Sequence, residues 1–141
     1  MKSKKIDDGW VLRLNKGEEI VQSLVQFCTE NYIKSGLISG IGGSDDISIK
    51  YYNLEKKEYI AKRFNDQDYE VISLTGNISL VEGKPFPHIH IVIGDSEYKT
   101  FGGHLGSAVI SITCEIFIIT AHDDVINRKL DEEFNLNFLD L

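Results

Sequence analysis

The sequence predicts an α+β fold, in which one main helix near the N-terminus packs on a mostly antiparallel sheet of about seven strands. Helical spacing of apolar residues occurs in only one segment, before residue 36. After that segment, apolar and polar residues alternate with a period of two, as in half-buried strands. The chain has 141 residues, two prolines and no visible linker or repeat. We therefore expect a single domain, 1–141.

The N-terminal part of the chain is expected to hold a flexible end, a short strand and the helix. Residues 1–8 carry three lysines and two aspartates and are predicted to be flexible, and Trp10–Leu14 reads as a strand. Asn15 followed by Glu18 is the pattern of a capping box, which opens a helix. Apolar residues then follow at helical spacing: Ile20, Leu24, Phe27 and Cys28. The helix is predicted to run to about Tyr32.

The rest of the chain reads as strands bounded by glycines and polar turns. The expected strands are Gly36–Ile41, Asp46–Asn53, Tyr59–Phe64, Tyr69–Leu80, His88–Ile93, Tyr98–His104 and Ala108–His122. The second and third should pair across a polar turn, the fourth should break or bend near Gly76, and the fifth and sixth should form a hairpin. Residues 123–141 are predicted to be an extended tail laid against the body of the domain.

Charge and cysteine usage narrow the class of protein. Fifteen Lys and Arg against 22 Asp and Glu give a formal net charge of −7. Because phosphate contacts supply much of the affinity for duplex DNA, this balance disfavours broad, sequence-independent DNA binding. Cys28 and Cys114 show no Cys-x-x-Cys spacing, so we expect two reduced, partly buried thiols in a cytoplasmic protein. No apolar run approaches the ~18 residues of a membrane helix, so no membrane partner is expected.

Three of the four histidines form the pattern that carries chemistry. His88 and His90 stand in a His-x-His pair, and His104 follows a glycine pair on the next expected strand. A His-x-His pair on a strand points both imidazoles to one face, about 7 Å apart along the strand. Three imidazoles on one face suit a divalent transition metal, Zn²⁺ above all, and leave a coordination position open. The alternative is that these histidines are solvated or hydrogen-bonded polar residues on an exposed sheet face.

The register between the two histidine strands decides whether His104 joins the pair. A two-residue hairpin turn would place His104 opposite Pro87, facing away from the other two imidazoles. A three-residue loop, or a bulge at the glycine pair before His104, would place it opposite His88. The metal site therefore requires an odd loop or a bulge between His90 and His104.

Glu115 is the second unusual residue, because it interrupts the apolar segment Ile110–Ile119. A carboxylate placed there is costly unless it is paired or hydrogen-bonded. Glu115 could hydrogen-bond a metal-bound histidine and fix its tautomer, could bond a basic side chain of a neighbouring subunit, or could face solvent at an edge. The sequence identifies no catalytic residue.

The motifs, taken in order along the chain, resemble a known family. The blocks are Arg13–Ile20, Ile38–Gly42, Glu70–Ile78, Gly83–His90, Gly102–Leu105 and Thr113–Phe117. Together they resemble the PPC (plants and prokaryotes conserved) domain over nearly the whole chain, in its stand-alone prokaryotic type. The resemblance implies an α+β homotrimer with His88, His90 and His104 as metal ligands. It also implies a DNA-binding label, which derives from plant members that carry an AT-hook; this sequence contains no such element.

These observations lead to one expected function and one alternative. We expect a small homotrimeric PPC-like domain that binds a divalent metal, most simply Zn²⁺, through three histidines and acts as a regulatory or interaction module. DNA is a partner by family label only, and the charge argues against it. The alternative is a cupin-like metal-dependent enzyme that acts on an unknown small molecule. In that case Glu97 would join the three histidines as a metal ligand, in the order His-x-His, Glu, His.

Overall fold

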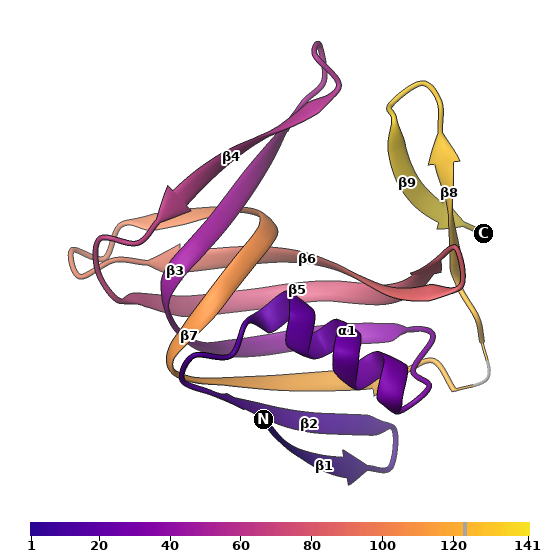
Figure 1. Ribbon diagram of the computed structural model, residues 1–141, viewed down its shortest axis with the longest axis horizontal. Coiled ribbons are helices and arrows are strands. Elements are labelled where there is room, and N and C mark those ends of the chain that lie inside the picture. The colour runs from indigo at the N-terminus through magenta and orange to yellow at the C-terminus, as the bar shows by residue number, and fades with distance from the viewer. Residues whose placement is uncertain (123) are drawn as a thin grey trace.

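The structure is a computed structural model that describes residues 1–122 and 124–141. Within these residues the chain forms nine strands and a single helix, α1 (Ile20–Glu30) (Figure 1). The strands are β1 (Lys2–Ile6), β2 (Gly9–Asn15), β3 (Gly36–Asn53), β4 (Glu58–Phe64), β5 (Tyr69–Val81), β6 (Lys84–Gly94), β7 (Thr100–Thr120), β8 (Asn127–Asp131) and β9 (Leu136–Asp140). The result is a small α+β fold, as predicted. Its sheet has more strands than expected and includes one parallel pair, β5 with β8.

The helix forms where the apolar spacing places it, but its N-cap is not the expected one. Glu19 caps the helix, since its carboxylate accepts hydrogen bonds from the backbone N–H groups of Val21 and Gln22. The same carboxylate accepts a hydrogen bond from the backbone N–H of Ala108 on β7 at 2.9 Å. Glu18 does accept from the backbone N–H of Asn15 at 2.8 Å, but this contact closes a turn that precedes the helix. Gly17, with a φ of +85°, keeps that turn out of the helix.

The four longest strands pair in a closed ring. β3 pairs with β5 and β7, and β6 pairs with the other sides of β5 and β7. Register shifts along β3 and β7 let both strands bend while they stay paired, and Figure 1 shows the sharp bend of β7 on its way from β6 to β2. For this reason β3 and β7 each join two segments that the sequence analysis had separated.

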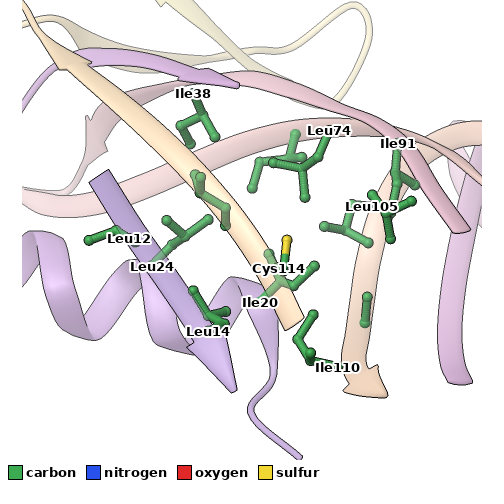
Figure 2. Close-up of a cluster of buried hydrophobic side chains, with 14 of the residues drawn as sticks. Leu12, Leu14, Ile20, Leu24, Ile38, Leu74, Ile91, Leu105, Ile110 and Cys114 are labelled. Carbon is green, nitrogen blue, oxygen red and sulfur yellow. The ribbon is translucent and has the colours of Figure 1, made fainter. Parts of the chain in front are cut away.

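The apolar core lies between the ring, β2 and α1. Figure 2 shows Leu12 and Leu14 of β2 close to Ile20 and Leu24 of the helix, and all four are fully buried. The two cysteines are free, as predicted, and they are fully buried in this core rather than partly buried. Burial raises the pKa of each thiol to about 12, so neither thiol is reactive at neutral pH.

Both ends of the chain differ from the expectation. Residues 1–8 were predicted to be flexible, but Lys2–Ile6 forms β1 and pairs along its length with β2. The tail 123–141 was predicted to be one extended segment, and residue 123 lies outside the described residues. Residues 127–140 fold back as the β8–β9 hairpin, through a turn in which Asn135 has a φ of 52°. No helix in the described part of the chain is long and apolar enough to span a bilayer.

A third difference concerns β5, which continues through Gly76 without the predicted break. Its irregularity lies between Val71 and Ser73 instead. Gly76 serves a close approach of two strands, because a Cβ placed there would lie 2.1 Å from the backbone oxygen of His88. The glycine thus lets β6 lie close against β5 at the histidine pair.

Candidate metal centre

The alternation of β6 directs the His-x-His pair outward. Ile89 and Ile91 are buried on the inner side of the ring, while His88 and His90 point to the outer side. On β7, His104 is the direct partner of His90. The three imidazoles therefore lie on the same face of the sheet.

The connection between β6 and β7 meets the geometric requirement stated above. Gly94 pairs with Thr100, so the loop comprises residues 95–99. The number of residues in this loop is odd, as required, although the loop is longer than the predicted three-residue loop. Pairing continues without a register shift from Gly94 to His90, so no bulge is needed at the glycine pair. With the longer loop, the partner of His104 is His90 and not His88.

The three side chains converge closely enough to share an ion. One nitrogen from each of His88, His90 and His104 lies within 4.8 Å of the other two. The ring centroids are 5.4 Å apart for His88 and His90, 5.1 Å for His88 and His104, and 5.7 Å for His90 and His104. Tetrahedral Zn²⁺ needs nitrogens about 3.3 Å apart, so the three side chains would have to draw closer together when they bind an ion. The Nδ1 atom of His104 is buried and has no hydrogen-bond partner among the described residues, so the donor set fits a metal ion.

The charge state of the cluster also suits a metal. Burial, followed by the charges of His88, His90 and Lys50, lowers the pKa of His104 to about 4. Burial, followed by Arg128 and His90, likewise lowers the pKa of His88. Both rings are therefore neutral at pH 7, which is the form that binds metals.

Arg128 of β8 is held against the cluster by a network of hydrogen bonds. Its guanidinium donates to Ser79 Oγ at 2.7 Å, to Asn77 Oδ1 at 2.8 Å and to the backbone oxygen of Asn137 at 2.7 Å. It also lies 3.2 Å from Nδ1 of His88. Because a guanidinium only donates, Nδ1 of His88 is the acceptor in this contact, and the proton of the neutral ring is then on Nε2. For His88 to bind a metal ion, this contact with Arg128 would have to open, so that Nδ1 or, in the other tautomer, Nε2 is free for the ion.

A pocket of about 370 Å³ opens beside the cluster, between the β3–β4 and β8–β9 hairpins. Figure 1 shows the two hairpins projecting on the same side of β6. On one wall, the ring of Tyr59 stacks on His104 with centroids 4.9 Å apart, and Lys50 Nζ lies 5.8 Å from the centre of the Tyr59 ring. Arg128 also lines the pocket. Sequence reasoning did not place Tyr59, Lys50 or Arg128 at this site, because each comes from a hairpin that only the tertiary fold brings to β6.

Two acidic residues that the sequence analysis considered lie elsewhere. Glu115 is exposed on β7 opposite Arg13 and Ile41, and it lines a different pocket. Glu97 lies in the loop at the far end of β6 and forms an ion pair with Lys99. The metal-binding group found among the described residues consists of the three histidines and includes neither glutamate. The structure therefore does not support Glu115 as a partner of a metal-bound histidine, or the ligand order on which the cupin-like alternative depends.

Comparisons with known proteins place this architecture among related chains. The profile of the Plants and Prokaryotes Conserved (PCC) domain matches residues 1–122. A candidate DNA-binding protein from Bacteroides thetaiotaomicron is 34% identical with a TM-score of 0.94, and the match covers 99% of this chain and 96% of that one. A metal-containing protein from Archaeoglobus fulgidus is 36% identical with a TM-score of 0.87, covering 96% and 94%.

Two further relatives extend the comparison. A plant- and prokaryote-conserved protein from Pyrococcus horikoshii is 33% identical with a TM-score of 0.88, and the match covers 99% of this chain and 94% of that one. Among curated proteins, the bifunctional protein GlmU from Synechococcus sp. is 24% identical over 122 residues. That match covers 85% of this chain but spans only 18% of the length of the relative.

Proposed function

This chain belongs to the Plants and Prokaryotes Conserved domain family, and from that premise we propose that it is a homotrimeric domain that binds one divalent metal ion per subunit. The ligands are His88, His90 and His104, and Zn²⁺ is the ion that this donor set suits best. The observation that carries the proposal is the convergence of three imidazole nitrogens within 4.8 Å on one sheet face. The metal-containing relative from Archaeoglobus fulgidus supports it. The domain then acts as a regulatory or interaction module.

The histidine set favours an ion with an open coordination position. Structural zinc sites are closed by four protein ligands, whereas three-ligand sites leave one position for water or another small group. Two of the proposed ligands come from β6 and one from β7, so a bound ion would also link these strands.

Metal content of the purified protein tests the proposal. Protein prepared without a histidine tag is expected to retain about one zinc ion per chain, measured by inductively coupled plasma mass spectrometry. His88→Ala and His104→Ala each remove a ligand and should lower the zinc content to background. His122→Ala is the matched control, because His122 is exposed and lies 3.5 Å from Asp8, outside the cluster. Zinc content unchanged in the two cluster variants would reject the site.

The trimer is supported by an exposed apolar face on the outer side of the sheet. Six large side chains form this apolar face, and each is at least 40% exposed: Leu37, Ile41, Ile72, Ile112, Phe117 and Ile119. Contiguous exposed apolar surface of this kind is typical of an interaction site between proteins. A homotrimer that buries this face would explain why it carries large apolar side chains.

DNA binding is the second candidate function, supported by the name of the relative from Bacteroides thetaiotaomicron. The basic residues of this chain are poorly placed for it. Lys2, Lys4 and Lys5 lie on β1, at the opposite end of the strand order from Arg128 on β8. Arg63 is paired with Asp46. If DNA binds, retardation of a duplex in a gel should weaken steeply with salt, and no retardation at low salt and micromolar protein would exclude it.

A further inference from the structure

The pocket beside the histidine cluster carries a second inference, which rests on the proposed metal site. We propose that this pocket binds a small organic anion with an apolar body, such as an aromatic carboxylate. The anionic group would lie toward Lys50, Arg128 and the histidine-bound ion, and the apolar body would lie against the aromatic walls. The site would thereby bind a ligand at the open coordination position of the metal.

The charge of the pocket is the first argument. The chain as a whole carries a formal charge of −7, yet the residues that line this pocket include Lys50 and Arg128 and no carboxylate. Within residues 1–122 and 124–141, neither cation forms an ion pair. A cationic concavity in an acidic protein concentrates anions, and a divalent ion on the histidines would strengthen the positive potential.

The hydrogen-bonding groups of the two cations are the second argument. Arg128 makes three hydrogen bonds to protein oxygens and contacts His88, so its guanidinium is already fixed in place and retains one of its five N–H donors. Lys50 Nζ forms no hydrogen bond in the described part of the chain and keeps all three of its donors. One fixed and one adjustable donor group in the lining of the same pocket suit a carboxylate, which accepts several hydrogen bonds.

The walls and the size of the pocket define the rest of the ligand. Tyr59, Phe86, Leu136 and Phe138 provide apolar surface, and the Phe86 ring lies 5.5 Å from the guanidinium carbon of Arg128. A volume of about 370 Å³ is at the lower end of the range for small-molecule sites. This space accommodates one small molecule with a ring.

Calorimetric titration of the zinc-loaded protein with benzoate tests the inference, with benzamide as the neutral probe of the same shape. We expect benzoate to bind and benzamide to bind at least tenfold more weakly. Lys50→Gln should weaken benzoate binding about tenfold, because one hydrogen bond to a charged group is lost. Arg128→Gln should weaken it similarly. Lys129→Gln is the matched control, since Lys129 is exposed on β8 and does not line the pocket.

Zinc analysis of the same samples separates this inference from the proposed function. If the wild-type protein holds zinc but does not bind benzoate at millimolar concentration, the anion pocket is wrong and the metal site stands. Equal affinity of the wild type and Lys50→Gln also overturns the pocket, and this variant is informative even if Arg128→Gln loosens the β8–β9 hairpin. If the wild type holds no zinc, the metal site is wrong. The anion pocket is then tested on the metal-free protein: it stands if benzoate binds and Lys50→Gln weakens that binding, and it is wrong otherwise.

Discussion

His104 is the residue on which the cluster depends most. It comes from a different strand than the His-x-His pair, and its position is fixed by the ring of Tyr59 and by the pairing of β7 with β6. Its buried Nδ1 atom lacks a hydrogen-bond partner in the described residues. Such an unpaired polar atom costs about 1–3 kcal/mol. An ion bound to Nδ1 itself would offset this cost with a new bond.

The lowered pKa of His104 predicts how acid affects the metal-free protein. The folded-state pKa of about 4 lies below the usual value of 6.5, so the unfolded chain binds more protons between these pH values. Stability should therefore fall as the pH falls from about 6.5 to about 4. Solvent screens this half-buried ring, so the loss attributable to His104 should be about 1 kcal/mol. Urea unfolding of chelator-treated protein at pH 7 and near pH 4.5, compared with His104→Gln, measures it.

The comparison between the wild type and His104→Gln isolates the contribution of His104 to this pH effect. His104→Gln should lose less stability on acidification, because it has removed a group that takes up a proton on unfolding. Equal pH dependence in the wild type and His104→Gln would show that His104 does not titrate with a lowered pKa.

At the scale of elements, the sequence patterns predicted those helices and strands whose formation depends on residues close together in the chain. Apolar spacing located α1, and alternation located the strands that hold His88 and His104. The prediction of an N-cap at Asn15 was wrong because Glu19 caps the helix instead. The Glu19 carboxylate also accepts a hydrogen bond from β7, a contact that depends on the tertiary fold and that no local pattern reveals. The bends that join 36–53 and 100–120 into single strands depend on pairing partners distant in sequence. For the same reason, no local pattern could show that Lys50 and Arg128 meet at the histidines.

Gly76 links one of these elements to the site, and its substitution should affect both stability and metal binding. A Cβ at residue 76 would meet the backbone oxygen of His88 at 2.1 Å, which forces β5 and β6 apart. Overpacking of this kind costs about 1–3 kcal/mol. Gly76→Ala should therefore lower the free energy of unfolding by this amount and also reduce zinc retention, measured by urea unfolding and metal analysis.

A glycine from the same ring supplies the control for this substitution. A Cβ at Gly43 would meet Ser111 Oγ at 3.3 Å, a contact with a side chain that a small adjustment relieves. Gly43→Ala should leave zinc retention unchanged. If Gly76→Ala is as stable as the wild type and retains zinc, the close approach of β5 and β6 does not support the site.

At the scale of the whole molecule, one sheet face carries both the histidines and the apolar surface. Asn77 of β5 pairs with Leu37 of β3 on one side and with His88 of β6 on the other. Directly opposed residues in antiparallel strands share a face. The exposed side chain of Leu37 and the histidine cluster are therefore separated by a single strand. A subunit seated on the apolar face would lie next to the cluster and would restrict access to it from that side.

The oligomeric state is the property that this arrangement predicts for the whole molecule. The wild type should sediment at about three times the chain mass of 15.9 kDa, because a monomer would leave the apolar face in water. Ile112→Asp and Ile41→Asp each place a carboxylate at an exposed position. In the single chain Ile112 is 72% exposed and Ile41 is 59% exposed. A carboxylate is compatible with a folded monomer there but costly in a dry interface, so both variants should sediment as monomers with unchanged helix and strand content by circular dichroism. Leu54→Asp, at a position that is 64% exposed in the β3–β4 turn, is the matched control and should remain trimeric. Two outcomes would show that subunits do not associate through this face. One is a wild type that is monomeric at micromolar concentration, and the other is that Ile112→Asp and Ile41→Asp stay trimeric.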